Sequence, residues 1–92
     1  MIRSFKNKDL KLFAERGDPS RLSVQNPDRI RRILARLAVA IQPGEMDLPG
    51  WRFHSLAGDR KGAYSVTVSG NWRITFKWDG EDAADVDLED YH

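Results

Sequence analysis

The chain of 92 residues contains no cysteine, which excludes disulfide bonds and thiol catalysis and favours a cytosolic protein. Its two histidines, His54 and His92, are too few to predict a structural zinc site. No apolar run reaches about 18 residues, so no transmembrane helix is expected, and the first ten residues lack the apolar stretch of a secretory signal. Motifs of metal hydrolases, phosphate-binding glycine loops and serine hydrolases are also missing. We therefore expect no metal and no cofactor.

The net charge of +1 conceals a strong segregation of charge along the chain. Residues 1–42 carry a net charge of +6 and residues 43–78 one of +2, whereas residues 79–92 hold seven acidic residues and no lysine or arginine. A basic body can attract an anionic partner, and a phosphate backbone is the commonest one. The alternative is that the acidic end lies beside the basic surface and neutralises it. Charge alone leaves both possibilities open.

The first half of the chain predicts a short strand over residues 1–5, followed by two helices. Asn7 can cap a helix through residues 8–16. Asn26 can cap the second helix, whose apolar side chains recur at helical spacing and predict a buried stripe. These side chains are Ile30, Ile33, Leu34, Leu37 and Ile41. The residues Gln42-Pro43-Gly44 end this helix.

The apolar pattern becomes alternating in the second half of the chain, which predicts four strands. They are residues 51–54, 63–68, 72–78 and 83–89, separated by turns at 58–62, 69–71 and 79–80. The side chains expected to face the core are Tyr64, Val66, Val68, Trp72, Ile74, Phe76, Trp78, Ala84, Val86 and Leu88.

Without the short stretch at 51–54, the order is β-α-α-β-β-β, which predicts one α+β domain over residues 1–92. Two N-terminal helices would cover one face of a twisted, mainly antiparallel sheet. The other face would be polar and uncovered, with Ser65, Thr67, Arg73, Thr75 and Lys77 on it, and is a natural place for a binding site.

His54, His92, Tyr91, Asp90 and the basic residues are the groups available for catalysis. They suit a reaction without a cofactor, the cleavage of RNA by its own 2′-hydroxyl group. This reaction needs a base, an acid and cations that stabilise the phosphorane. Histidine titrates near neutrality and can be base or acid. Arg73 can bind two phosphate oxygens at once, and a strand would hold it more firmly than a loop.

Each of these residues also has a purely structural alternative. Arg73 can pair with Asp85 or Asp87 across the sheet, His54 can be an ordinary surface histidine, and a chain end such as His92 is disordered by default. The cations of the second helix and of the charged turn can be solvated surface; they are Arg29, Arg32, Arg36, Arg60 and Lys61. The residues alone permit a nuclease without establishing one.

Four segments stand out by their order and spacing: MIRSFKNKDLKLF at the start, HSLAGDR at 54–60, NWRITF at 71–76 and EDYH at 89–92. Together they resemble the HigB group of the RelE/ParE toxin superfamily over essentially the whole chain. The resemblance implies a RelE-like fold and a toxin of a type II toxin–antitoxin system. It implies a ribosome-dependent endoribonuclease, an mRNA interferase that blocks translation by cutting mRNA in the ribosomal A site.

The resemblance also implies partners and site residues. The partners are a HigA-like antitoxin with a helix-turn-helix domain, the 70S ribosome and mRNA, with operator DNA reached only through the antitoxin. The catalytic residues would be His54, Arg73, Asp90, Tyr91 and His92. Either histidine would transfer protons, Arg73 would bind the scissile phosphate, Tyr91 would stack on a base or transfer a proton, and Asp90 would orient a neighbour. The expected RNA-binding residues are Arg60, Lys61, Lys77, Arg29, Arg32 and Arg36.

Two departures from the family pattern matter. Ala57 stands where the family often has lysine, and Ser69 where it often has a basic residue; each lost cation removes a contact of about 1–3 kcal/mol. We hypothesise that Lys61 partly compensates for Ala57. Two alternatives stay open, a ParE-like inhibitor of DNA gyrase and an inactive relative that only binds its antitoxin.

Overall fold

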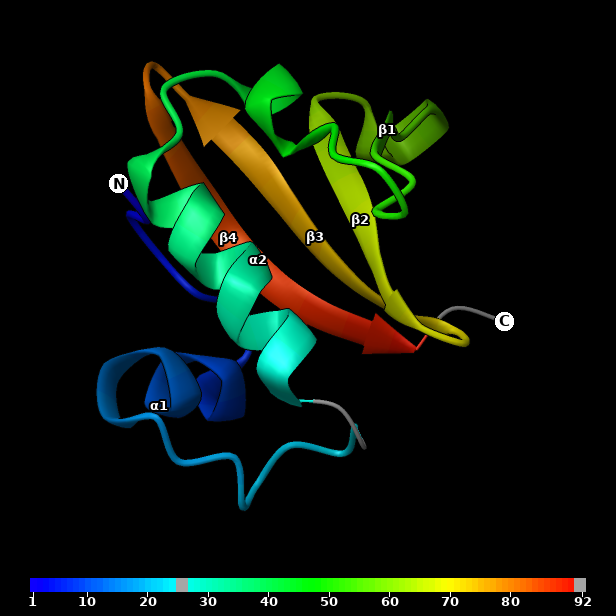
Figure 1. Cartoon of the computed structure of the whole chain (residues 1–92). Helices are drawn as coiled ribbons and strands as arrows, with labels where there is room; N and C mark the ends of the chain where they lie inside the picture. Colours follow the sequence, from blue (N-terminus) through cyan, green and yellow to red (C-terminus); the bar gives the residue numbers. More distant parts are fainter. Residues whose placement is uncertain (25–26, 91–92) are drawn as a thin grey trace.

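The computed structural model describes residues 1–24 and 27–90, and its elements follow the predicted division of the chain (Figure 1). The helices are α1 (Lys8–Arg16), α2 (Pro27–Val39) and the short 3-10 helices η1 (Pro43–Met46) and η2 (Gly58–Arg60). The strands are β1 (His54–Ser55), β2 (Ala63–Ser69), β3 (Trp72–Asp79) and β4 (Asp82–Asp90), which form one antiparallel sheet in the order β1-β2-β3-β4. The predicted α+β fold is therefore confirmed. Within the described ranges, no helix combines the length and apolar content needed to cross a membrane.

Helix α1 begins and ends as predicted. The Asn7 side chain accepts a hydrogen bond from the Leu10 amide at 3.0 Å, so it satisfies one of the free N–H groups of the first turn. Gly17 ends the helix with φ of 69°, and its N–H donates to the Phe13 carbonyl. Asn26, the predicted cap of α2, lies outside the described residues.

The apolar stripe of α2 lies in the core, with one exception. Ile30, Ile33 and Leu37 are fully buried. Ile41 is 58% exposed, so its assignment to the core was wrong. The helix ends at Val39, and the helical spacing that the prediction extended to Ile41 no longer applies. The small side chain of Ala40 is buried there instead.

One face of the sheet packs against α2, which lies in front of β4 in Figure 1. Val66, Ile74 and Phe76 are fully buried on this face. Stacked aromatic rings join β2 to β3, with centroids 5.8 Å apart between Tyr64 and Phe76. Because successive side chains of a strand point to opposite faces, this packing directs Arg73 and Thr75 to the far side of the sheet.

The predicted strand over residues 1–5 is not formed as a strand. Two isolated parallel bridges, Ile2 with Ala83 and Phe5 with Val86, hold this segment against the edge of β4. The predicted strand at 51–54 is also shorter, because Arg52 has φ of 50° and interrupts the extended backbone before His54.

Strand β4 contains a bulge that the alternating pattern did not reveal. Thr75 pairs with Asp87 but Lys77 pairs with Ala84, so two residues of β4 oppose one residue of β3. Asp85 lies in the bulge with φ of 50°. The alternation changes face there, so Ala83 is buried and the inward assignment of Ala84 was wrong.

Candidate active site

His54 is the first residue of β1 and lies on the polar face of the sheet. A backbone carbonyl two residues earlier in the chain orients its ring. Its Nδ1 lies 3.0 Å from the Arg52 carbonyl oxygen. A carbonyl oxygen can only accept a hydrogen bond, so a neutral His54 carries its proton on Nδ1. The lone pair of Nε2 then points into the site.

Two hydrogen-bond donors converge on that lone pair. The hydroxyl group of Ser65 lies 3.2 Å from His54 Nε2, and Nη1 of Arg73 lies 3.4 Å from the same atom. Ser65 is 1% exposed and faces His54 directly in the β1–β2 register, so its position is fixed by the sheet. The structure thus places the Arg73 guanidinium next to Nε2 of His54, and both residues were predicted to belong to the site.

The strand register surrounds Arg73 with polar residues. Thr67 of β2 lies opposite Arg73 on one side and Glu89 of β4 on the other. The predicted structural alternative paired Arg73 with Asp85 or Asp87. In the register, however, Asp87 faces Thr75 and Asp85 lies in the bulge, 3.9 Å from Nζ of Lys77.

Glu89 is bound by residues other than its strand neighbour. Arg60 donates from Nη1 to Oε1 at 2.9 Å and from Nη2 to Oε2 at 2.6 Å, and Thr75 Oγ1 donates to Oε2. The Arg60 guanidinium lowers the pKa of Glu89 most, and Thr75 lowers it further, although burial opposes both. Glu89 in turn raises the pKa of Arg60.

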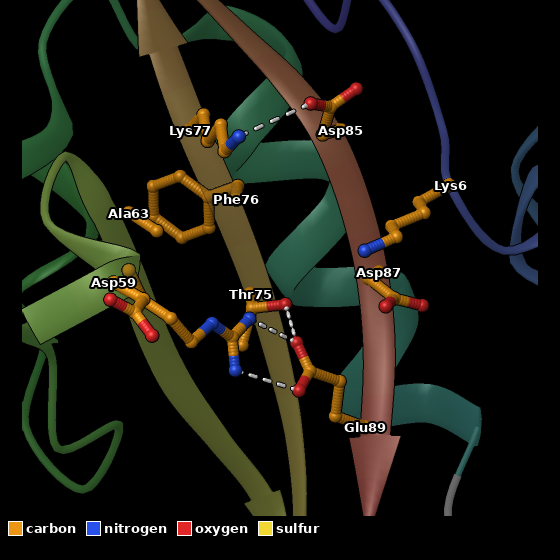
Figure 2. A pocket seen from close by; sticks show the side chains of 10 residues that line it. Lys6, Asp59, Ala63, Thr75, Phe76, Lys77, Asp85, Asp87 and Glu89 are labelled. Carbon is orange, nitrogen blue, oxygen red and sulfur yellow. Dashed lines mark hydrogen bonds and ion pairs between the residues drawn. The ribbon is translucent and has the colours of Figure 1, made fainter.

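Two cavities share this Arg60–Glu89–Thr75 network as a wall. A small one of about 40 Å³ adjoins His54, Ser65 and Arg73. A larger one of about 230 Å³ lies on the other side and is drawn in Figure 2, where Lys6, Lys77, Asp85 and Asp87 also line it and α2 runs behind the strands. In the part of the chain that the structure describes, no cluster of three or more His, Asp or Glu side chains could hold a metal ion.

Comparisons with known proteins match this chain along its whole length. A model of the family described as RelE-like toxin of type II toxin–antitoxin system HigB matches residues 3–92. The endoribonuclease HigB of Proteus vulgaris is 45% identical over 92 residues, which cover all of both chains. The chain belongs to the HigB-like toxin family. Membership in this family implies an antitoxin partner.

Of the five predicted catalytic residues of this HigB-like toxin, the structure brings His54 and Arg73 into contact. Asp90 ends β4 and lies opposite Trp72, one position beyond the Arg73–Glu89 pair. Tyr91 and His92 lie outside the described residues, so their predicted roles stay predictions.

The predicted RNA-binding cations of the HigB-like toxin fall into two groups. Arg60, Lys61 and Lys77 lie on or beside the polar face, and Lys61 lines an open hollow with Ala57. The other group is on α2, across the sheet. There Arg29 donates to the carbonyl oxygens of Thr67 and Gly50, and Arg36 donates to that of Glu45. Arg32, on the same helix, is exposed.

Sequence reasoning gave no role to Ser65, Thr75 or Glu89 in the HigB-like toxin. It placed Ser65 and Thr75 on the polar face and Glu89 outward, but their contacts depend on strand register. The register of β1 against β2 brings Ser65 to His54, and that of β3 against β4 brings Glu89 beside Arg73. Composition and spacing carry no signal for either pairing.

Proposed function

We propose that this HigB-like toxin is a metal-independent endoribonuclease that cuts mRNA in the ribosomal A site and thereby blocks translation. The convergence of Arg73 and Ser65 on Nε2 of His54 is the observation that carries the proposal. It supplies a proton acceptor and a phosphate-binding cation on one exposed sheet face. The Proteus vulgaris relative, named an endoribonuclease, supports the same reaction class.

The chemistry requires no group beyond protein side chains and the RNA. The 2′-hydroxyl attacks the adjacent phosphorus, the P–O5′ bond breaks, and a 2′,3′-cyclic phosphate and a 5′-hydroxyl result. His54 Nε2 is suited to accept the 2′-hydroxyl proton because the proton of the neutral ring is held on Nδ1 by Arg52. Arg73 would bind the non-bridging oxygens and stabilise the charge that grows on them.

The C-terminal residues complete this proposal. A second group must protonate the leaving 5′-oxygen, and His92 or Tyr91 would do so, with Asp90 orienting a neighbour. Asp90 supports this part of the proposal, because it lies opposite Trp72, next to the Arg73–Glu89 pair.

The remaining expectations about partners are part of the proposal. A HigA-like antitoxin with a helix-turn-helix domain would neutralise the toxin, and operator DNA would be bound only through that antitoxin. Because translating ribosomes are the site of action, we propose a cytoplasmic location. The stripe of Arg29, Arg32 and Arg36 is on the helix side, so it would contact the ribosome or the antitoxin rather than the scissile strand.

Mapping of mRNA 5′ ends in cells that express the toxin tests the proposal. The wild-type protein should produce new 5′ ends within codons of translated mRNA, and Arg73→Ala or His92→Ala should reduce them by about 100-fold. Arg16→Ala, which removes an exposed cation at the end of α1, is the matched control and should leave the cuts unchanged. DNA damage without mRNA cuts would instead support a gyrase inhibitor, and neither effect would support an inactive antitoxin-binding relative.

A further inference from the structure

The position of Glu89 creates a problem for the proposed site. Glu89 lies directly opposite Arg73 in the antiparallel register, where side chains of this kind have Cβ atoms about 5 Å apart. Both residues also line the small cavity of about 40 Å³ beside His54. A carboxylate in that position can form a bidentate pair with a guanidinium and would compete with phosphate for Arg73.

The structure shows Glu89 held by other groups. Both terminal nitrogens of Arg60 donate to the Glu89 carboxylate, one to each oxygen, and Thr75 donates to Oε2. Thr75 is only 5% exposed, so its hydroxyl group is a fixed anchor on the sheet. Figure 2 shows the Glu89 side chain extending from β4 toward Thr75 on β3. The carboxylate is thereby directed toward Arg60, which comes from η2 outside the strands.

The charges favour the same arrangement. Arg60 and Glu89 neutralise each other, so the Glu89 carboxylate is not an uncompensated negative charge beside Arg73. The pKa of Glu89 is lowered chiefly by Arg60, so Glu89 is ionised at neutral pH and the pair persists there. Arg60 uses both terminal nitrogens on Glu89, which makes it poorly placed to bind phosphate itself.

We propose that Arg60 is a positioning residue: by holding Glu89, it prevents this carboxylate from pairing with Arg73 and keeps the Arg73 guanidinium beside His54 for the scissile phosphate. The inference rests on the proposed endoribonuclease function. It assigns Arg60 a role different from the direct RNA contact that the sequence predicted. It also gives a reason for the ion pair that joins η2, the charged turn before β2, to β4.

A double-mutant test separates the two roles of Arg60. Cleavage of mRNA on programmed ribosomes is measured for the wild type, Arg60→Ala, Arg60→Lys and the double variant Arg60→Ala/Glu89→Gln. Arg60→Ala should lower kcat by about tenfold or more, because Glu89 then turns to Arg73. Lysine keeps the positive charge but cannot form the bidentate pair of a guanidinium, so the kcat of Arg60→Lys should lie between those of Arg60→Ala and the wild type. The double variant has no competing carboxylate and should recover to within about threefold of the wild type.

A second readout does not depend on RNA cleavage. The ¹⁵N signal of Arg73 Nε–H, assigned from its disappearance in Arg73→Lys, should shift in Arg60→Ala and return in the double variant. Arg16→Ala is the matched loss of a cation and should leave the signal in place. Thermal melting of each variant shows which of them are folded. The Arg73 signal is also compared in Arg60→Lys, which keeps the positive charge at position 60.

Distinct outcomes overturn the two proposals. If the double variant stays as defective as Arg60→Ala, or if Arg60→Ala raises KM alone, then Arg60 contacts RNA directly and the positioning role is wrong. An unmoved Arg73 signal in folded Arg60→Ala also contradicts it. If the wild type cuts no RNA while the Arg73 signal moves and returns as expected, the positioning role stands and the proposed function fails.

Discussion

At the scale of single residues, His54 shows how one backbone carbonyl decides what a side chain can do. The Arg52 carbonyl fixes the proton of the neutral ring on Nδ1, and Ser65 and Arg73 approach the other nitrogen. Arg52 can present its carbonyl in this way because its φ of 50° turns the backbone just before β1. The sequence predicted His54 and Arg73 as site residues, but the backbone turn that orients His54 has no signature in the residue types.

Lys61 is the residue whose proposed role follows from a departure in the sequence. Lys61 and Ala57 line the same hollow, which also includes Ser55 next to His54, so we expect the Lys61 ammonium to serve in place of a lysine at position 57. We expect Lys61→Ala to lower RNA cleavage by about threefold to tenfold, which corresponds to one weakened phosphate contact. Lys8→Ala on α1 is the matched control. Unchanged cleavage and toxicity in Lys61→Ala would show that Lys61 does not compensate for Ala57.

The lowered pKa of Glu89 predicts how stability depends on pH. A carboxyl group whose folded-state pKa lies below its ordinary value of 4.5 stabilises the fold above that value. This stabilisation is lost as the pH falls through the lowered pKa, because the protonated group no longer pairs with Arg60. Urea unfolding at a series of pH values should show a loss of unfolding free energy below about pH 4.5 in the wild type. The loss of unfolding free energy should be smaller in Glu89→Gln. If the two proteins lose the same free energy over this pH range, Glu89 does not contribute to the pH dependence of stability.

At the scale of secondary-structure elements, periodicity predicted most of the fold and failed where the backbone departs from regular geometry. The cap of α1, the α2 stripe and the hairpin between β2 and β3 follow from local residue patterns. Ile41, Ala84 and the strand at residues 1–5 were wrong. Ile41 lies beyond the end of α2, Ala84 lies beside the β4 bulge, and residues 1–5 contact β4 through two isolated bridges. All three features depend on tertiary pairing.

The bulge in β4 makes a prediction about Asp85. Its φ of 50° favours glycine, while its backbone N–H donates to Ser4 Oγ at 2.8 Å whatever the side chain. Asp85→Gly should therefore be more stable than Asp85→Ala by about 1 kcal/mol in unfolding free energy. At Asp87, which pairs regularly with Thr75, the order should reverse, because glycine weakens a regular strand. If glycine is the more stable variant at both positions, or alanine at both, then the backbone of the bulge does not determine the preference at Asp85.

At the scale of the whole molecule, the segregated charges are partly neutralised within the fold. The acidic C-terminal stretch lies beside earlier cations: Arg3 pairs with Asp79 and Asp82, Lys77 with Asp85 and Arg60 with Glu89. This is the structural alternative that the sequence left open. It is compatible with the proposed binding face, because Glu89 near one end of β4 lines the small cavity and Asp82 at the other end pairs with Arg3.

The two groups of predicted RNA-binding cations lie on opposite sides of the sheet, which predicts different consequences of charge reversal. Lys77→Glu, on the polar face, should weaken mRNA binding by about tenfold and reduce its salt dependence. Arg32→Glu, on α2, changes the net charge equally and should weaken it by about threefold or less. Binding titrations at several salt concentrations measure both. A larger effect of Arg32→Glu would mean that RNA approaches the helix face.

The central claim is that the His54–Arg73 face cuts RNA through the 2′-hydroxyl group of the substrate. The most direct test compares cleavage of two mRNAs on programmed ribosomes, one of them carrying a single 2′-deoxynucleotide 5′ to the scissile phosphate. The account predicts that the all-ribose mRNA is cut to a 2′,3′-cyclic phosphate and a 5′-hydroxyl, and that the deoxy substitution abolishes cutting at that position. Equal cleavage of the two mRNAs would contradict it.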